Sequence, residues 1–136
     1  MKIRELHRDE RGLVGKLAIV WILILALLGV AAVDTVSIAL TTFKLSDVAT
    51  EAASDGAVAY RSHHDVTEAC DEARASVTRQ DPALKVGPAF CRVDEASGRV
   101  TVTLHATART VLAGRLSFTQ RYTNVVDSET NGPSEV

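Results

Sequence analysis

The 136-residue chain carries 15 Lys and Arg against 17 Asp and Glu, and only 4% of its residues are aromatic. From residue 34 onward the balance is more acidic, with 10 Lys or Arg against 14 Asp or Glu. This composition argues against the clustered basic surface that nucleic-acid binding requires, so we expect no nucleic-acid partner.

The first element in chain order is an uncharged, apolar run over residues 17–33, with the sequence LAIVWILILALLGVAAV. As a helix this run is roughly 26 Å long, and the uncharged residues 35–43 can extend it beyond the ~30 Å hydrocarbon core of a bilayer. Inside lipid the backbone must pair its own polar groups, so the run must be helical. The sequence therefore predicts a single-pass membrane helix, which makes the membrane the first expected partner.

The charges on either side of this run predict its orientation. The preceding leader, residues 1–16, contains five basic residues: Lys2, Arg4, Arg8, Arg11 and Lys16. Basic residues near a membrane helix stay in the cytoplasm, whereas acidic residues have little influence. We therefore expect the leader inside the cell membrane and residues 34–136 outside.

A cleaved secretory signal is the alternative, because the small residues at 29–32 offer cleavage positions. Against cleavage, the helical pattern continues over residues 34–60, which contain no Pro and only one Gly, Gly56. Apolar residues recur there at helical spacing, and the small residues between Ala49 and Ala59 suit close packing against another element. We expect one helix of about 45 residues, embedded in lipid over its first half and solvated over its second.

Residues 61–126 predict a small head of a helix and an antiparallel sheet. Ser62 or Asp65 can cap a helix from Asp65 to Arg79, and the Asp81-Pro82 pair ends it. After this pair, apolar and polar residues alternate, as they do in strands. Residues 89–94 and 99–109 predict a hairpin, and residues 114–122 predict a third strand. Residues 127–136, with the sequence DSETNGPSEV, have too little to bury and predict a flexible tail.

The chain has two cysteines, Cys70 and Cys91, and both lie in the predicted head. Cys70 is on the apolar face of the second helix and Cys91 is on the first strand, so the two can meet between helix and sheet. In an oxidising compartment such a pair predicts a disulfide, with two buried free thiols as the alternative. The nearby His63 and His64 do not match the ligand spacing of zinc sites, so we expect no metal.

No stretch of the sequence matches a catalytic motif. The chain has no Gly-x-Ser-x-Gly, no His-Glu-x-x-His and no Gly-x-Gly-x-x-Gly. Gly15 and Lys16 do not form a phosphate loop, because position 10 is Glu10 and Leu17 follows the lysine. We expect no enzymatic activity and no cofactor.

The order of these parts resembles the TadE/TadG-like proteins of the Flp (Tad, type IVc) pilus-assembly family. The resemblance covers residues 8–60: a basic leader that ends in Arg11-Gly12, the apolar helix, Asp34 at its outer end, and the alanine-rich continuation KLSDVATEAASDGAVAY. It implies a pilin-like α+β fold, in which a long N-terminal membrane helix continues into a head with a second helix and a three-stranded antiparallel sheet.

The resemblance also implies processing and partners. In the family a prepilin peptidase cuts after the leader glycine, here Gly12, so that Leu13 becomes the first residue. The helix then packs beside other pilin-like or pilus-assembly proteins. A glutamate normally lies five residues after the cut, but this chain has Leu17 there, beside Lys16. This departure points away from a bulk fibre subunit and toward a minor pilin or an uncleaved assembly factor.

Asp34 has two interpretations at this stage. Its carboxylate either marks the outer membrane boundary, where it reaches water, or contacts a basic group on a partner helix. For the whole chain, the sequence favours a non-enzymatic pilin-like membrane protein in biogenesis of an Flp/Tad-type pilus or a related secretion apparatus. The alternatives are a membrane-anchored extracytoplasmic binding module and a secreted domain released by signal peptidase. The lack of a Gly/Ser/Pro-rich linker after the membrane helix favours the first over the binding module.

Overall fold

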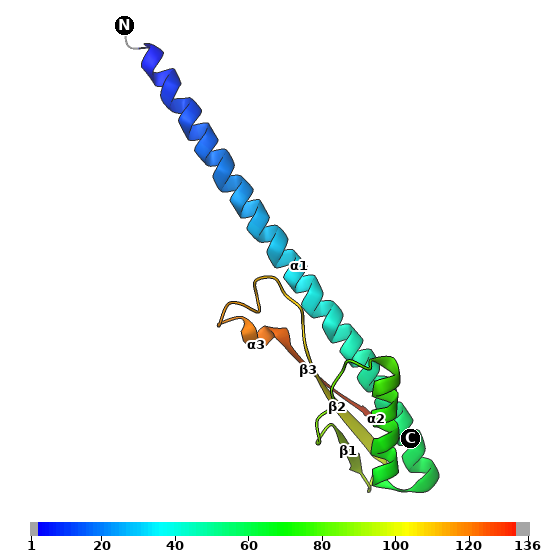
Figure 1. Ribbon diagram of the computed structural model, residues 1–136. Helices are drawn as coiled ribbons and strands as arrows, with labels where there is room; N and C mark the ends of the chain where they lie inside the picture. Colours follow the sequence, from blue (N-terminus) through cyan, green and yellow to red (C-terminus); the bar gives the residue numbers. More distant parts are fainter. Residues whose placement is uncertain (1–2, 133–136) are drawn as a thin grey trace.

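The computed structural model describes the backbone of residues 3–132 and the side chains of residues 14–132. A long helix carries a small head against its C-terminal half (Figure 1). The elements follow in the order α1 (Ile3–His63), α2 (Val66–Gln80), β1 (Cys91–Asp94), β2 (Arg99–Thr107), α3 (Gln120–Thr123) and β3 (Asn124–Asn131). The expected α+β, pilin-like layout of a long helix, a second helix and a three-stranded antiparallel sheet is confirmed.

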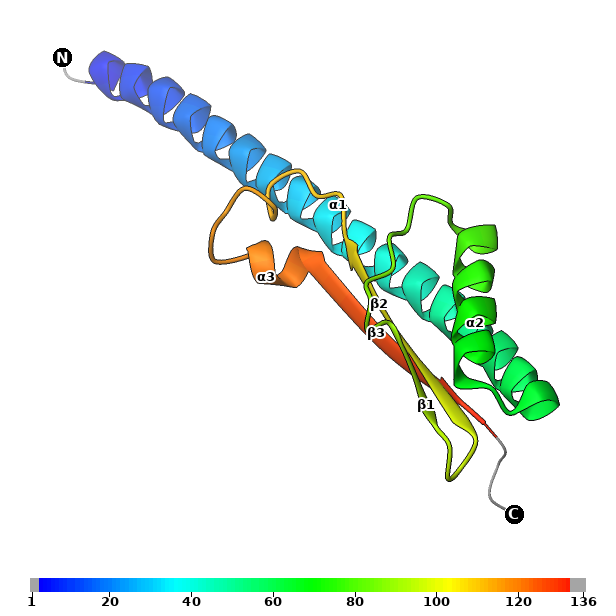
Figure 2. The same ribbon diagram turned by 60° about the horizontal axis from the view of Figure 1, so that its bottom comes forward.

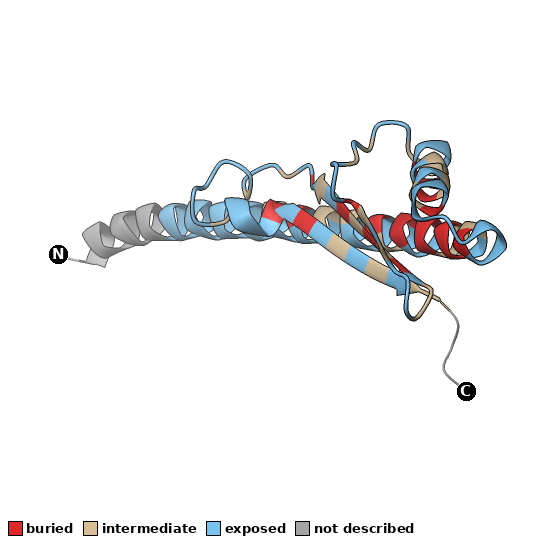
Figure 3. Cartoon of the chain, turned by 90° about the horizontal axis from the view of Figure 1, so that it is seen from below, coloured by how far each residue is buried: buried red, intermediate tan, exposed pale blue. Residues whose placement is uncertain are grey.

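α1 is one continuous helix of 61 residues. The apolar run and residues 34–60 therefore belong to one element, as expected, although the helix begins earlier, at Ile3. α1 is long and apolar enough to cross a membrane. Within the described residues nothing covers its apolar segment, where Trp21 is 57% and Leu25 is 62% exposed. Figure 3 shows this segment as exposed, with the buried residues of α1 gathered in its C-terminal part.

The small residues of α1 allow α2 and the sheet to pack closely against it. Gly56 lies where all three meet: a Cβ at this position would be 3.0 Å from the carbonyl oxygen of Ala69 on α2 and 3.1 Å from Cγ1 of Val100 on β2. The resulting core includes Leu45, Val48, Ala49, Ala52, Ala53 and Ala57 of α1, Ala69, Ala73 and Val77 of α2, and Val100, Val102 and Leu104 of β2.

Replacing Gly56 by leucine is expected to destabilise the head by about 1–3 kcal/mol, because the added side chain overpacks a closed contact. Chemical unfolding of the detergent-solubilised protein measures the loss. Gly29 is the matched control on the same helix, since a Cβ there meets nothing within 4 Å. Gly29→Leu should leave the head unchanged, and an equal stability of the two variants would contradict this packing.

Asp65 is the N-cap of α2, because its side chain accepts hydrogen bonds from the backbone N–H groups of Thr67 at 2.7 Å and Glu68 at 3.0 Å. These groups, Glu68 first, hold the pKa of Asp65 below its usual range. Of the two cap residues that the sequence allowed, Asp65 is therefore the one used. The Ser62 hydroxyl instead donates to the Val58 carbonyl inside α1.

The sheet has the order β1-β2-β3 and both pairings are antiparallel. The predicted alternation of β2 is confirmed, because Val100, Val102 and Leu104 are buried whereas the intervening residues are more exposed. β2 ends at Thr107 and not at residue 109, and β1 begins at Cys91 and not at residue 89.

Two expectations for the C-terminal part were wrong. Residues 114–122, predicted as a third strand, instead form the end of a loop, up to residue 119, and most of the short helix α3. Residues 127–131, predicted as the start of a flexible tail, belong to β3, which pairs along β2 from Asn124 opposite Thr107 to Asn131 opposite Val100. The predicted tail beyond residue 132 lies outside the described residues.

Polar contacts explain why β3, which has few apolar residues, forms a strand. Thr101 and Thr130 share a side-chain hydrogen bond at 2.8 Å across the β2–β3 pair. On the opposite face, the hydroxyl of Ser46 on α1 donates to Glu129 at 3.1 Å. Main-chain pairing, the cross-strand contact with β2 and the contact with α1 stabilise β3 without a continuous apolar face.

Candidate functional site

Asp34 lies at the junction between the apolar segment of α1 and the head, and its side chain is bound by a loop of the head. The loop comprises residues 108–119 and follows β2. One carboxylate oxygen accepts the N–H of Val111 at 2.6 Å. The other accepts those of Leu112 at 2.9 Å and Ala113 at 2.8 Å. One α1 side chain thus satisfies three consecutive backbone donors of the loop. Asp34 is only 5% exposed.

This contact bears differently on the two interpretations of Asp34. A contact with a basic group on a partner helix stays a prediction. The carboxylate does not simply face water at a membrane boundary, because the side chain is buried. Its charge is balanced by main-chain N–H groups of its own chain, which form stronger hydrogen bonds to an ion than to a neutral acceptor. The hydroxyl of Ser37 adds a fourth link by donating to the Arg109 carbonyl at 2.5 Å. The 108–119 loop is therefore fastened to α1 where the apolar segment ends.

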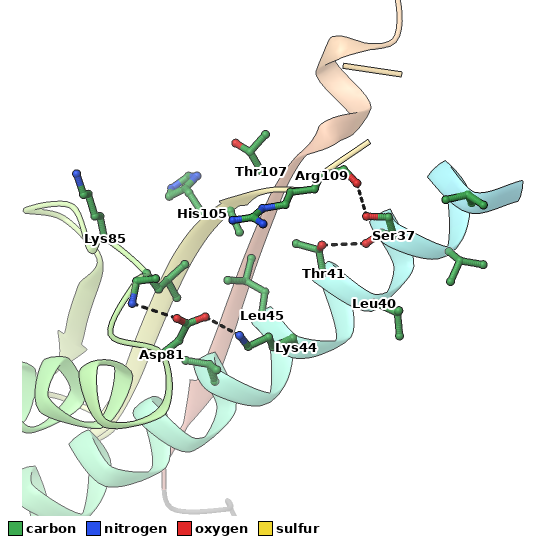
Figure 4. Close-up of a pocket in the computed structure, with 16 residues that line it drawn as sticks. Ser37, Leu40, Thr41, Lys44, Leu45, Asp81, Lys85, His105, Thr107 and Arg109 are labelled. Atoms are coloured by element: carbon green, nitrogen blue, oxygen red, sulfur yellow. Dashed lines mark hydrogen bonds and ion pairs between the residues drawn. The ribbon is translucent and has the colours of Figure 1, made fainter. Parts of the chain in front are cut away.

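A groove of about 890 Å³ lies beside this junction, between α1, the segment after α2 and the end of β2 (Figure 4). Its α1 side carries apolar side chains, among them Val36, Leu40 and Leu45. The segment after α2 contributes Asp81 and Lys85, and β2 and the residues after it contribute His105 and Arg109, which Figure 4 draws as sticks. The groove thus combines an apolar α1 wall with a mostly basic rim.

The charges on the rim are only partly neutralised within the chain. Lys44 contacts Asp81 at 2.7 Å, and this hydrogen bond, followed by the N–H of Ala83, lowers the pKa of Asp81. In the part of the chain that the structure describes, Lys85 and Arg109 form no ion pair. The groove therefore has the charge to bind an anionic group.

The edge of β2 at the groove is open. Thr103 donates its N–H to the Phe90 carbonyl at 2.7 Å, just before β1 begins. Because main-chain groups alternate between the two sides of a strand, those of His105 and Thr107 point to the same side. Across residues 3–132 no strand pairs with β2 there. The edge can accept an extended segment as an added strand.

The predicted disulfide is present. Cys70 of α2 is bonded to Cys91, the first residue of β1, with 5.7 Å between the two Cα atoms. The bond joins the second helix to the sheet. Neither cysteine is therefore a free thiol. Residues 14–132 contain no group of three His, Cys, Asp or Glu side chains placed to hold a metal ion.

The predicted processing residues Arg11, Gly12 and Leu13 lie in the α1 backbone, but their side chains are outside the described residues. The sequence missed the partners of Asp34 because they follow it by 77 to 79 positions. The sequence offered one signal for such partners, which is the position of the carboxylate beside an apolar run. Where water is excluded, a carboxylate needs hydrogen-bond donors from the protein.

Comparison of the chain with family models, with curated proteins and with solved structures gives no match. The fold and the Asp34 junction therefore carry the functional proposal. Two features are specific to that junction: a charged side chain of α1 binds the head directly, and no flexible linker separates the apolar segment from the head.

Proposed function

We propose that this chain is a non-enzymatic, pilin-like membrane protein, a minor pilin or an assembly factor, in biogenesis of an Flp/Tad-type pilus or a related secretion apparatus. The observation that carries the proposal is the unbroken course of α1 from the apolar segment into the core of the head. A tethered binding domain needs only a flexible linker at this point. A continuous helix transmits the position of the membrane segment to the head as one rigid unit.

The proposed topology places the leader in the cytoplasm and the head outside the cell membrane. The basic residues of the leader support this orientation. The Cys70–Cys91 disulfide supports it independently, because disulfides persist in oxidising compartments outside the cytoplasm.

The division of α1 into a covered and an uncovered part suggests how the protein meets its partners. From Leu45 onward, the inner face of α1 is occupied by α2 and the sheet. The segment from Val14 to Leu40 keeps large apolar side chains exposed, so it is the part that is free to pack beside helices of other pilin-like proteins. If the chain is a minor pilin, a prepilin peptidase processes the leader after Gly12, which leaves Leu13 as the new first residue, whereas an assembly factor keeps the leader.

A photo-crosslinking amino acid at Leu25, in the native host, tests the proposal. We expect covalent adducts with pilin-like or pilus-assembly proteins, because Leu25 is 62% exposed within the membrane segment. The same crosslinker at Val58, half-exposed at the far end of α1, is the matched control. If Leu25 yields no protein adduct under conditions that retain other pilus components, the assembly proposal is wrong.

A membrane-anchored binding module is the second candidate function, and the groove with the open β2 edge favours it. In that case an extended, anionic segment would bind between Lys85 and Arg109 without any helix contact in the membrane. Loss of ligand capture by Arg109→Glu, together with an absence of crosslinks from Leu25, would select this alternative.

A further inference from the structure

An exposed apolar patch occupies the end of the head nearest the membrane segment. Five large side chains between residues 111 and 122 are exposed: Val111 (55%), Leu112 (38%), Leu116 (44%), Phe118 (71%) and Tyr122 (64%). We call these residues the loop patch. Exposed apolar side chains that gather in one segment mark a contact surface more often than scattered ones do.

The position of the loop patch is fixed by Asp34. Its carboxylate holds Val111, Leu112 and Ala113 beside α1, directly after the uncharged residues 17–33. In Figures 1 and 2 the loop runs alongside α1 at the end of the sheet that faces the N-terminal segment. When residues 17–33 lie in a bilayer, the loop patch lies at its outer surface.

The charge around the loop patch suits a phospholipid surface. Residues 108–122 contain Arg109, Arg115 and Arg121 but no Asp or Glu, although residues 34–136 as a whole are net acidic. None of these arginines forms an ion pair in the described part of the chain, and the Arg121 guanidinium lies 5.9 Å from the Tyr122 ring centre. Arginine with apolar and aromatic residues is typical of segments that bind at the interface of a bilayer.

We infer that the 108–122 segment is a second membrane contact of this protein. Leu116 and Phe118 enter the outer leaflet of the bilayer that α1 spans, while the arginines contact lipid phosphates. The segment thereby fixes the tilt of the head relative to the membrane. This inference rests on α1 crossing a membrane and does not depend on assembly into a pilus.

Tryptophan fluorescence of the full chain in lipid nanodiscs tests the inference. Trp21 is the only tryptophan, so a Trp21→Phe background allows a single reporter to be placed by Phe118→Trp. Lipids that carry a quencher near the headgroup should quench this reporter severalfold more strongly than a Val58→Trp reporter at the far end of α1. Arg115→Gln should weaken the quenching in nanodiscs that contain phosphatidylglycerol.

Two outcomes would overturn the inference. Equal lipid quenching of the two reporters would place residue 118 away from the bilayer. Protection of the Phe118→Trp reporter from aqueous iodide without lipid quenching would show that protein, such as a second copy of the chain, covers the loop patch instead.

Discussion

Replacing Cys70 and Cys91 together by alanine is expected to lower the free energy of unfolding of the head by about 3 kcal/mol. The bond joins α2 to β1 across a sequence separation of 21 residues, and its loss enlarges the conformational freedom of the unfolded chain. The effect is large relative to the total, because a head of this size has only a marginal core. Urea unfolding in detergent, monitored by hydrogen exchange of the β2 amides, measures this loss of free energy of unfolding.

The apolar segment of α1 should be unaffected by the same change. Residues 14–33 make few contacts with the head, so their helicity in detergent should persist after the disulfide is removed. Reduction of the unmodified protein should reproduce the loss of head stability and have no effect on the double alanine variant. If reduction leaves the unfolding curve of the unmodified protein in place, the disulfide contributes nothing to the fold.

Replacing Asp34 by asparagine is expected to release the 108–119 loop from α1. The carboxylate accepts from three backbone N–H groups, whereas the amide has one acceptor oxygen and turns an N–H₂ donor toward the remaining donors. Hydrogen exchange of the Val111, Leu112 and Ala113 amides should become faster by about tenfold or more, the change expected from losing a hydrogen bond to a charged group.

Asp47→Asn is the matched control, because Asp47 is an exposed acid on the same helix. It should leave the exchange of the three loop amides unchanged. The Asp34 variant should also reduce lipid quenching of the Phe118→Trp reporter, since the loop patch is then no longer held at the bilayer surface. Unchanged exchange at Val111 to Ala113 in Asp34→Asn would show that the carboxylate does not hold the loop.

The features that the sequence predicted well have local or periodic signals. The unbroken α1 follows from an apolar run joined to a segment without Pro, and the inner face of β2 follows from strict alternation at Val100, Val102 and Leu104. The disulfide was predictable because only two cysteines exist and their elements face each other across one layer.

The features that it missed depend on contacts between distant residues. β3 has few apolar residues, and its stability comes from pairing with β2 and from contacts such as Ser46 to Glu129, which no local pattern reveals. Leu116 and Phe118 alternate as in a strand but are exposed in a loop, so their spacing misled the assignment of the third strand. The role of Asp34 requires donors that the chain supplies only after the sheet has formed.

The first residue and intact mass of the mature protein, purified from membranes of its native host, test most directly whether the apolar segment remains part of one helix with the head. We predict a chain that retains residues 17–33. A start at Leu13 would indicate prepilin processing, and a start at Met1 would indicate an uncleaved assembly factor. A start near Ala32 or Asp34 would show that the segment is a cleaved signal, and would contradict the pilin-like membrane protein proposed here.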